Sequence, residues 1–145
     1  MATMSYGKAA NSIERTLRNS RADSRRLSTF EIYSTISELH DVWKECSLIG
    51  WDGHGALPVE QATYRAAYCL IDSLPLGFPM PSIGAEPDGQ LTMEWRKSPR
   101  RVFSVSIDPE GFLHYAGLFG MNKRYGTLVF FSNAPDELLQ LVREL

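Results

Sequence analysis

The sequence contains few cysteines and no long apolar segment. It holds two cysteines, Cys46 and Cys69, and neither has a second thiol or a histidine at metal-ligand spacing. We therefore expect two buried thiols in a reducing compartment, without a disulfide framework or a zinc site. No apolar run approaches the roughly 18 residues that a membrane helix needs, and no apolar signal-peptide core precedes the first arginines. We expect a cytoplasmic protein with no membrane segment.

The chain also lacks internal repeats, a domain linker after residue 28, and any complete catalytic, metal-binding or nucleotide-binding motif. We expect neither a cofactor nor a metal ion. The amino-acid composition is typical of one soluble domain, because 43% of the 145 residues are hydrophobic and 22% are charged. A chain of this length buries roughly 68–70% of the surface that its unfolded form exposes. A substantial core is therefore expected.

Opposite charges are separated along the chain. Residues 1–27 carry a net charge of +4, and the remaining residues carry −6. The basic residues of the first segment are Lys8, Arg15, Arg18, Arg21, Arg25 and Arg26. Because large aliphatic residues are scarce there, we expect residues 1–27 to form a basic flexible arm with at most one helical turn near residues 12–18. Such an arm, attached to a single domain of residues 28–145, can bind nucleic acid, an acidic partner or the body itself.

Two helices are predicted after the arm. Ser28 and Glu31 resemble a capping box, and apolar residues then recur at spacings of three and four, which predicts a helix over about residues 29–47. Pro58 is suited to the first turn of a second helix, which should stop at Leu74 before a proline.

From residue 82 the hydrophobic period changes from helical to two. Turn sequences such as Asp88-Gly89 separate the alternating segments, as is typical of antiparallel hairpins. The segments lie at about residues 91–96, 103–107, 112–118 and 127–131. Asn133 should then cap a C-terminal helix. We predict an α+β fold with two N-terminal helices, an antiparallel meander of four or five strands, and a C-terminal helix packed on the sheet.

The segment Trp51-Asp52-Gly53-His54-Gly55-Ala56 is the most distinctive motif, and its glycines indicate a shaped loop between the two helices. Asp52 and His54 could share an acid–base site. No recognisable nucleophile motif accompanies them. The competing interpretation is structural, with Asp52 accepting hydrogen bonds from loop amides and a buried Trp51 filling the core. All three residues remain candidates for a binding site.

Two other kinds of site are conceivable. A zinc site would have to join residues of a helix, a loop and a strand, namely His40, Asp52, His54 and His114. Glycosyl chemistry would need a pair among the hairpin carboxylates, which are Glu86, Glu94, Asp108 and Glu110. No spacing in the sequence favours either arrangement, so we predict no metal ligands and no catalytic residues.

A second group of basic residues surrounds the predicted hairpins. It consists of Arg96, Lys97, Arg100 and Arg101 in the 96–101 hairpin, with Lys123 and Arg124 in the glycine-containing stretch that follows. One edge of the sheet could therefore be cationic and contact phosphates together with the arm. Solvated turn residues that protect an edge strand would produce the same pattern.

From about residue 50 onward the chain resembles a group of small, uncharacterised bacterial proteins that share a Trp-Asp-Gly-x-Gly-Ala loop. The residues that carry the resemblance are Trp51 to Ala56, Pro58, Leu74-Pro75, Asp88-Gly89 and Glu94-Trp95. It covers roughly the last two thirds of the chain and leaves the arginine-rich segment outside. The resemblance implies a bacterial or mobile-element origin and no particular activity.

The leading hypothesis is a non-catalytic protein that binds another macromolecule, as antitoxins, immunity proteins and inhibitors encoded on mobile DNA do. A protein partner is expected. Two alternatives remain open from the sequence: a small enzyme with a site on the 51–56 loop, and a nucleic-acid-binding module that uses the basic arm and the 96–101 hairpin.

Overall fold

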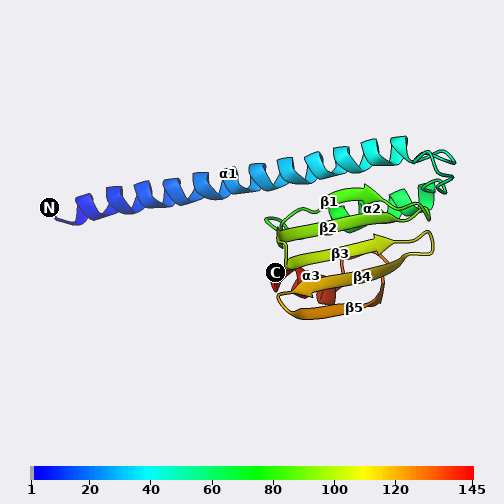
Figure 1. Cartoon of the computed structure of the whole chain (residues 1–145). Coiled ribbons are helices and arrows are strands. Elements are labelled where there is room, and N and C mark those ends of the chain that lie inside the picture. The colour runs from blue at the N-terminus through cyan, green and yellow to red at the C-terminus, as the bar shows by residue number, and fades with distance from the viewer. Residues whose placement is uncertain (1) are drawn as a thin grey trace.

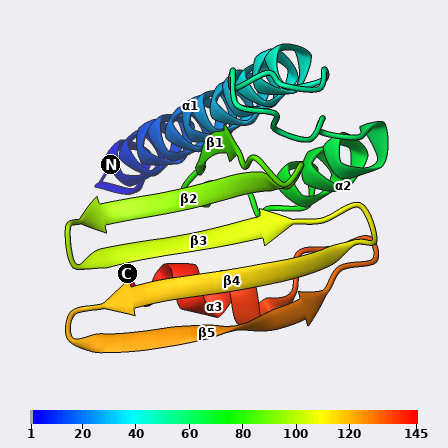
Figure 2. The same ribbon diagram turned by 45° about the vertical axis from the view of Figure 1, so that its right-hand side comes forward.

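The protein combines three helices with one antiparallel sheet in the part of the chain that the structure describes. A computed structural model describes the backbone of residues 2–145 and the side chains of residues 11–22 and 25–145. The elements are α1 (Ala2–Glu45), α2 (Gln61–Asp72), β1 (Ser82–Ala85), β2 (Leu91–Ser98), β3 (Arg101–Ile107), β4 (Phe112–Phe119), β5 (Asn122–Val129) and α3 (Asp136–Arg143). Each strand pairs with the next one along the chain, so the sheet is a meander (Figure 2). The predicted α+β class is confirmed.

One face of the sheet forms the core. The alternation predicted for β2 and β3 places their apolar side chains on this face, where they are buried: Leu91, Met93, Trp95, Phe103, Val105 and Ile107. Helices α2 and α3 lie behind the same face, whereas α1 runs along the edge formed by β1 (Figures 1 and 2). Leu138, Leu141 and Val142 of α3 are buried against the sheet, as predicted. The alternate residues of the strands form the opposite face.

Helix α1 has two halves with different surroundings. At 44 residues it is about 66 Å long at 1.5 Å per residue. Its C-terminal half packs on the body, where Leu39 and Cys46 are buried and Trp43 stacks on Tyr64 with ring centroids 4.5 Å apart. Its N-terminal half projects beyond the body (Figure 1), and Leu17 there is 54% exposed. No described helix is long and apolar enough to cross a membrane.

The prediction that residues 1–27 contain only one helical turn is wrong, because α1 is continuous from Ala2. Neither glycine nor proline occurs between Lys8 and Ile49, and alanine, arginine and leucine have high helix propensity. Once the packed half has formed, each further residue adds a hydrogen bond without a new nucleus. Ser28 therefore lies inside the helix instead of capping it.

Two predicted helix starts are displaced. Helix α2 begins at Gln61 and not at Pro58, and Glu60 before it has extended backbone with φ −72° and ψ 155°. The amide of Val59 donates to the carbonyl of Cys46 at 2.9 Å, which ties this segment to the end of α1. Helix α3 begins after Pro135, so Asn133 is not its cap.

The two cysteines have different surroundings. Cys46 is buried, as predicted, and burial raises the pKa of its thiol. Cys69 is exposed, which corrects the prediction of a second buried thiol. The buried face of α2 is formed by Thr63, Ala67, Leu70 and Ile71. Cys69 points away from that face because successive helix residues are about 100° apart around the axis.

The last hairpin is tighter than predicted. Gly120 and Met121 form the turn, and β5 begins at Asn122. Lys123 and Arg124 therefore belong to a strand, although the sequence placed them in a connecting loop. Asn122 to Val129 pair along the whole length of β4, because the glycine turn has a positive φ of 70° that lets the chain reverse at once.

Gly126 of β5 makes room for an aromatic ring of the core. A Cβ at this position would lie 2.7 Å from the hydroxyl of Tyr115 on β4. That hydroxyl donates a hydrogen bond of 3.1 Å to Glu137, which joins the sheet to α3. Burial raises the pKa of Tyr115, and the neighbouring Glu137 raises it further.

Candidate functional site

The 51–56 loop is held by its own backbone. The Asp52 carboxylate accepts hydrogen bonds from the amides of His54 at 2.8 Å and Ala56 at 3.0 Å. These bonds lower the pKa of Asp52, with the His54 amide contributing most. Gly50, Gly53 and Gly55 all have positive φ, between 74° and 83°, as this tight path requires.

The ring of His54 does not contact the Asp52 carboxylate. Its Nδ1 atom lies 3.0 Å from the main-chain oxygen of Asp52. Trp51 is partly buried, which corrects the prediction of a fully buried ring, and its indole N–H donates to the carbonyl of Leu57 at 2.8 Å. The hydrogen bonds of Trp51, Asp52 and His54 thus go to nearby backbone atoms of the same connection.

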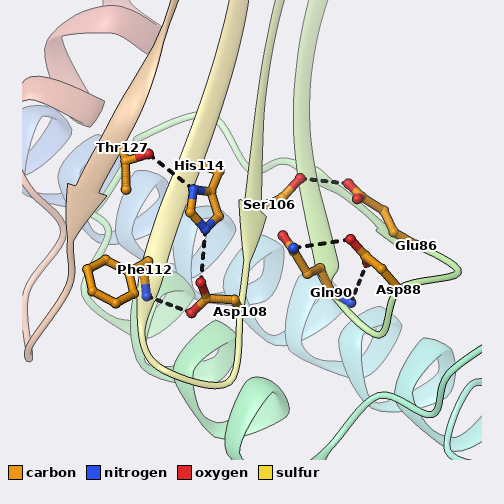
Figure 3. A network of polar contacts seen from close by, with 8 residues as sticks. All are labelled: Glu86, Asp88, Gln90, Ser106, Asp108, Phe112, His114 and Thr127. Carbon is orange, nitrogen blue, oxygen red and sulfur yellow. Dashed lines mark hydrogen bonds and ion pairs between the residues drawn. The ribbon is translucent and has the colours of Figure 1, made fainter.

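A polar network lies on the face of the sheet that the helices leave open (Figure 3). The ring of His114 on β4 lies between two partners, with Nε2 at 2.9 Å from the Asp108 carboxylate and Nδ1 at 3.1 Å from the Thr127 hydroxyl. Burial raises the pKa of Asp108, but hydrogen bonds from His114 and from the Phe112 amide outweigh it, and the net shift is downward.

A second part of this network centres on Glu86. The hydroxyls of Thr92 and Ser106 donate to the same Glu86 oxygen at 2.5 and 2.6 Å. Strand pairing explains the arrangement, since Thr92 is opposite Ser106 and Ser106 is opposite His114 across neighbouring strands. These residues lie near the turns of two hairpins at one end of the sheet (Figure 3).

An imidazole between a carboxylate and a hydroxyl can move a proton. Here the same contacts also fix β4 to β5 and to the turn before β4, because Asp108, His114 and Thr127 come from three consecutive segments. A structural role, in which these contacts connect neighbouring strands, is therefore enough to explain the arrangement.

The histidines that could have formed a zinc site do not come together. His40 packs against the rings of Trp43 and Tyr64, His54 lies in the loop, and His114 lies on the open face of the sheet. Among the described residues, no group of three or more histidine, cysteine, aspartate or glutamate side chains could hold a metal ion.

The two predicted groups of basic residues do come together at one end of the molecule. The β2–β3 hairpin end carries Arg96, Lys97, Arg100 and Arg101, and β5 brings Lys123 and Arg124 beside it. Both hairpin turns lie at the end of the sheet beyond which the N-terminal half of α1 projects (Figures 1 and 2). The opposite end carries the acidic turns with Glu86, Asp88, Asp108 and Glu110.

Three residues of this end have partners that fix them in place. Arg96 pairs with Glu94 at 3.0 Å, and Arg124 pairs with Glu144 at 2.7 Å. Arg101 donates to the carbonyl of Glu144 at 3.3 Å. In contrast, Lys97, Arg100 and Lys123 form no ion pair with any described residue.

Two hollows flank the basic end. One, of about 600 Å³, is lined by Arg96, Lys97 and Arg143 together with apolar residues such as Met80. The other, of about 350 Å³, lies between α1 and the segment before β1, and its lining includes Arg21, Arg25, Leu76 and Gly77.

Sequence reasoning missed the His114 network, whereas it anticipated that the basic residues of the hairpins could form one cationic region together with the arm. The network depends on strand register, because only the pairing of β3 with β4 places Ser106 beside His114. The alternation of Ser106, Asp108 and His114 with apolar residues was a visible signal that they share one face. It did not show which of them would touch.

Comparison with known proteins adds no assignment: the chain matches no family model, and neither the curated proteins nor the solved structures contain a match to it.

Proposed function

We propose that this protein is non-catalytic and acts by binding another macromolecule, as antitoxins, immunity proteins and inhibitors encoded on mobile DNA do. The observation that carries the proposal is the projecting half of α1, in which Ile13 and Leu17 are both more than half exposed. Helices in proteins gain most of their stability from packing one face. A long helix with an unpacked half offers that half to a partner.

The charge distribution also indicates that the partner binds at the end of the molecule from which α1 projects. Every basic residue except Lys44 and Arg65 belongs to the first 26 residues, to the hairpin end or to the end of α3. This concentration of one sign at one end raises the rate and selectivity of association with an oppositely charged partner.

The 51–56 loop has a structural role in this proposal. The Asp52 carboxylate is engaged by two backbone amides, and the His54 ring faces a backbone oxygen rather than that carboxylate. The Gly50 amide closes the loop by donating to the carbonyl of Ala56 at 2.8 Å. These contacts shape the connection between α1 and α2.

Affinity capture of the full-length chain from its native host tests the proposal. A partner should co-elute in fixed proportion and should reassemble with the chain from purified components. The Arg18→Ala/Arg21→Ala/Arg25→Ala variant should lose it, whereas Arg65→Ala, which removes an exposed cation of α2, should retain it. A chain that elutes alone at low salt, and whose triple variant acts normally in the host, contradicts the proposal.

A further inference from the structure

We infer that the partner is a nucleic acid, held by its phosphates in the corner between the projecting half of α1 and the hairpin end of the sheet. This basic corner has a helix wall, formed by Arg18, Arg21 and Arg25, and a hairpin wall, formed by Lys97 and Arg100 at the turn between β2 and β3. The inference rests on the proposed function and names the chemistry of its partner.

Helical geometry sets the direction of the helix wall. Eighteen residues correspond to about five turns of an α-helix. Arg21 is therefore in line with Leu39, and Arg25 is in line with Trp43. Leu39 and Trp43 pack against the body, so these arginines leave the helix on the side where the body lies.

The hollow between α1 and the body supports this direction independently. Arg21 and Arg25 line it from the helix, and Leu76 and Gly77 line it from the segment that precedes β1. Arg21 and Arg25 of the helix wall thus border a concave space between α1 and the body. The hairpin wall lies at the end of the sheet beyond which α1 projects (Figure 2).

The cations of the corner are not neutralised by the described residues of the protein. Arg21 and Arg25 form no ion pair with any of these residues, and Arg18 has only Glu14, at 3.9 Å and with both side chains exposed. Such an exposed pair contributes little. Cations gathered at one end of a protein reinforce each other's field and attract a polyanion.

A nucleic acid fits this corner better than an acidic protein does. Protein interfaces have an apolar centre with a polar rim, whereas in and beside the corner the cations outnumber the exposed apolar residues, Leu17 and Leu76. Duplex nucleic acid presents regularly spaced phosphates and grooves, and the major groove of DNA admits an α-helix. Arginine is suited to bind phosphate through two parallel hydrogen bonds.

Fluorescence anisotropy with labelled duplexes of DNA and of RNA tests the inference, with the purified full-length chain at salt concentrations between about 50 and 200 mM. At least one duplex should bind, with an affinity that falls steeply as salt rises. The Arg18→Ala/Arg21→Ala/Arg25→Ala variant should bind at least roughly tenfold more weakly at the middle of this range. The slope of log affinity against log salt should decrease by about 2–3, since each phosphate that a cation neutralises contributes about 0.9.

Matched variants distinguish binding at the basic corner from general electrostatic attraction to the protein. Lys97→Ala/Arg100→Ala should also weaken binding and reduce the salt slope, whereas Arg65→Ala should bind like the wild type. Alanine favours helix, so circular dichroism should show unchanged helix content in the variants of α1. Equal weakening by Arg65→Ala would overturn the inference, because it would show general attraction rather than a site.

The outcomes also separate this inference from the proposed function. Absence of binding to either duplex at the lowest salt concentration overturns the inference. If the corner variants then lose an identified protein partner, the binding function stands with a protein in place of nucleic acid. If they lose no partner of either kind, both proposals fail.

Discussion

Leu39→Ala measures how firmly the C-terminal half of α1 is built into the body. Leu39 is 0% exposed and belongs to the central cluster of buried residues. Removal of a fully buried leucine side chain destabilises proteins by about 2–5 kcal/mol, through the burial that disappears and the cavity that remains. For a chain of this size that corresponds to a decrease of roughly 10 °C in melting temperature, at about 2–4 °C per kcal/mol.

Leu17→Ala is the matched control, because it makes the same change in the same helix on the projecting half. Leu17 is 54% exposed and lies among residues that are themselves exposed. Its truncation should change the free energy of unfolding by no more than about 0.5 kcal/mol. Urea denaturation followed by far-ultraviolet circular dichroism measures both variants on one scale.

Two results would refute the reasoning. If Leu39→Ala and Leu17→Ala differ by less than about 1 kcal/mol, the two halves of α1 do not have different environments. If Leu17→Ala is strongly destabilising and its midpoint depends on protein concentration, the projecting half is packed against a second copy and is not available to another partner.

Two further predictions concern the sheet. Gly126→Ala should lower the free energy of unfolding by about 1–3 kcal/mol, because its Cβ would displace the Tyr115 ring; unchanged urea stability would contradict the close packing. The pKa of Asp108 is lowered on folding, so its stabilisation is complete above the unfolded-state value and is lost as pH falls through the folded-state value. Asp108→Asn should therefore reduce stability more near neutral pH than in strong acid below the folded-state pKa, and an equal reduction would refute this.

The sheet was largely predictable because each strand carries its own information. The alternation of Leu91, Met93 and Trp95 with polar residues identifies a strand and its buried face without reference to any other segment. Short turns then leave antiparallel pairing with the next strand as the simplest arrangement. The meander follows from these two local properties, and the structure confirms it.

Helix α1 was mispredicted because composition was interpreted as a measure of order. Few large aliphatic residues precede Leu27, which suggested that nothing could fold the segment. The structure extends the helix from its packed half, whose core is formed around Leu39 and Trp43. Propagation needs only good helix formers and no breaker, and residues 8–49 contain neither glycine nor proline.

In the candidate site, too, local features were predictable and the spatial arrangement was not. The sequence identified the basic residues of the N-terminal segment and of the 96–101 hairpin and suggested that they could contact phosphates together, but it did not place them in space. Their shared end arises because α1 runs along β1 and because both hairpin turns reverse the chain at the end from which α1 projects. No local pattern encodes that juxtaposition.

Local sequence patterns were enough to specify the class of fold, the strands with their buried faces, and the shaped loop that the glycines around Asp52 indicate. These depend on side-chain period and backbone freedom within a few residues. Three features became known from the three-dimensional arrangement alone: which end of the sheet lies toward the projecting helix, which carboxylate His114 contacts, and on which side of α1 the arginines emerge. Those outcomes depend on register and packing between segments that are distant in the chain.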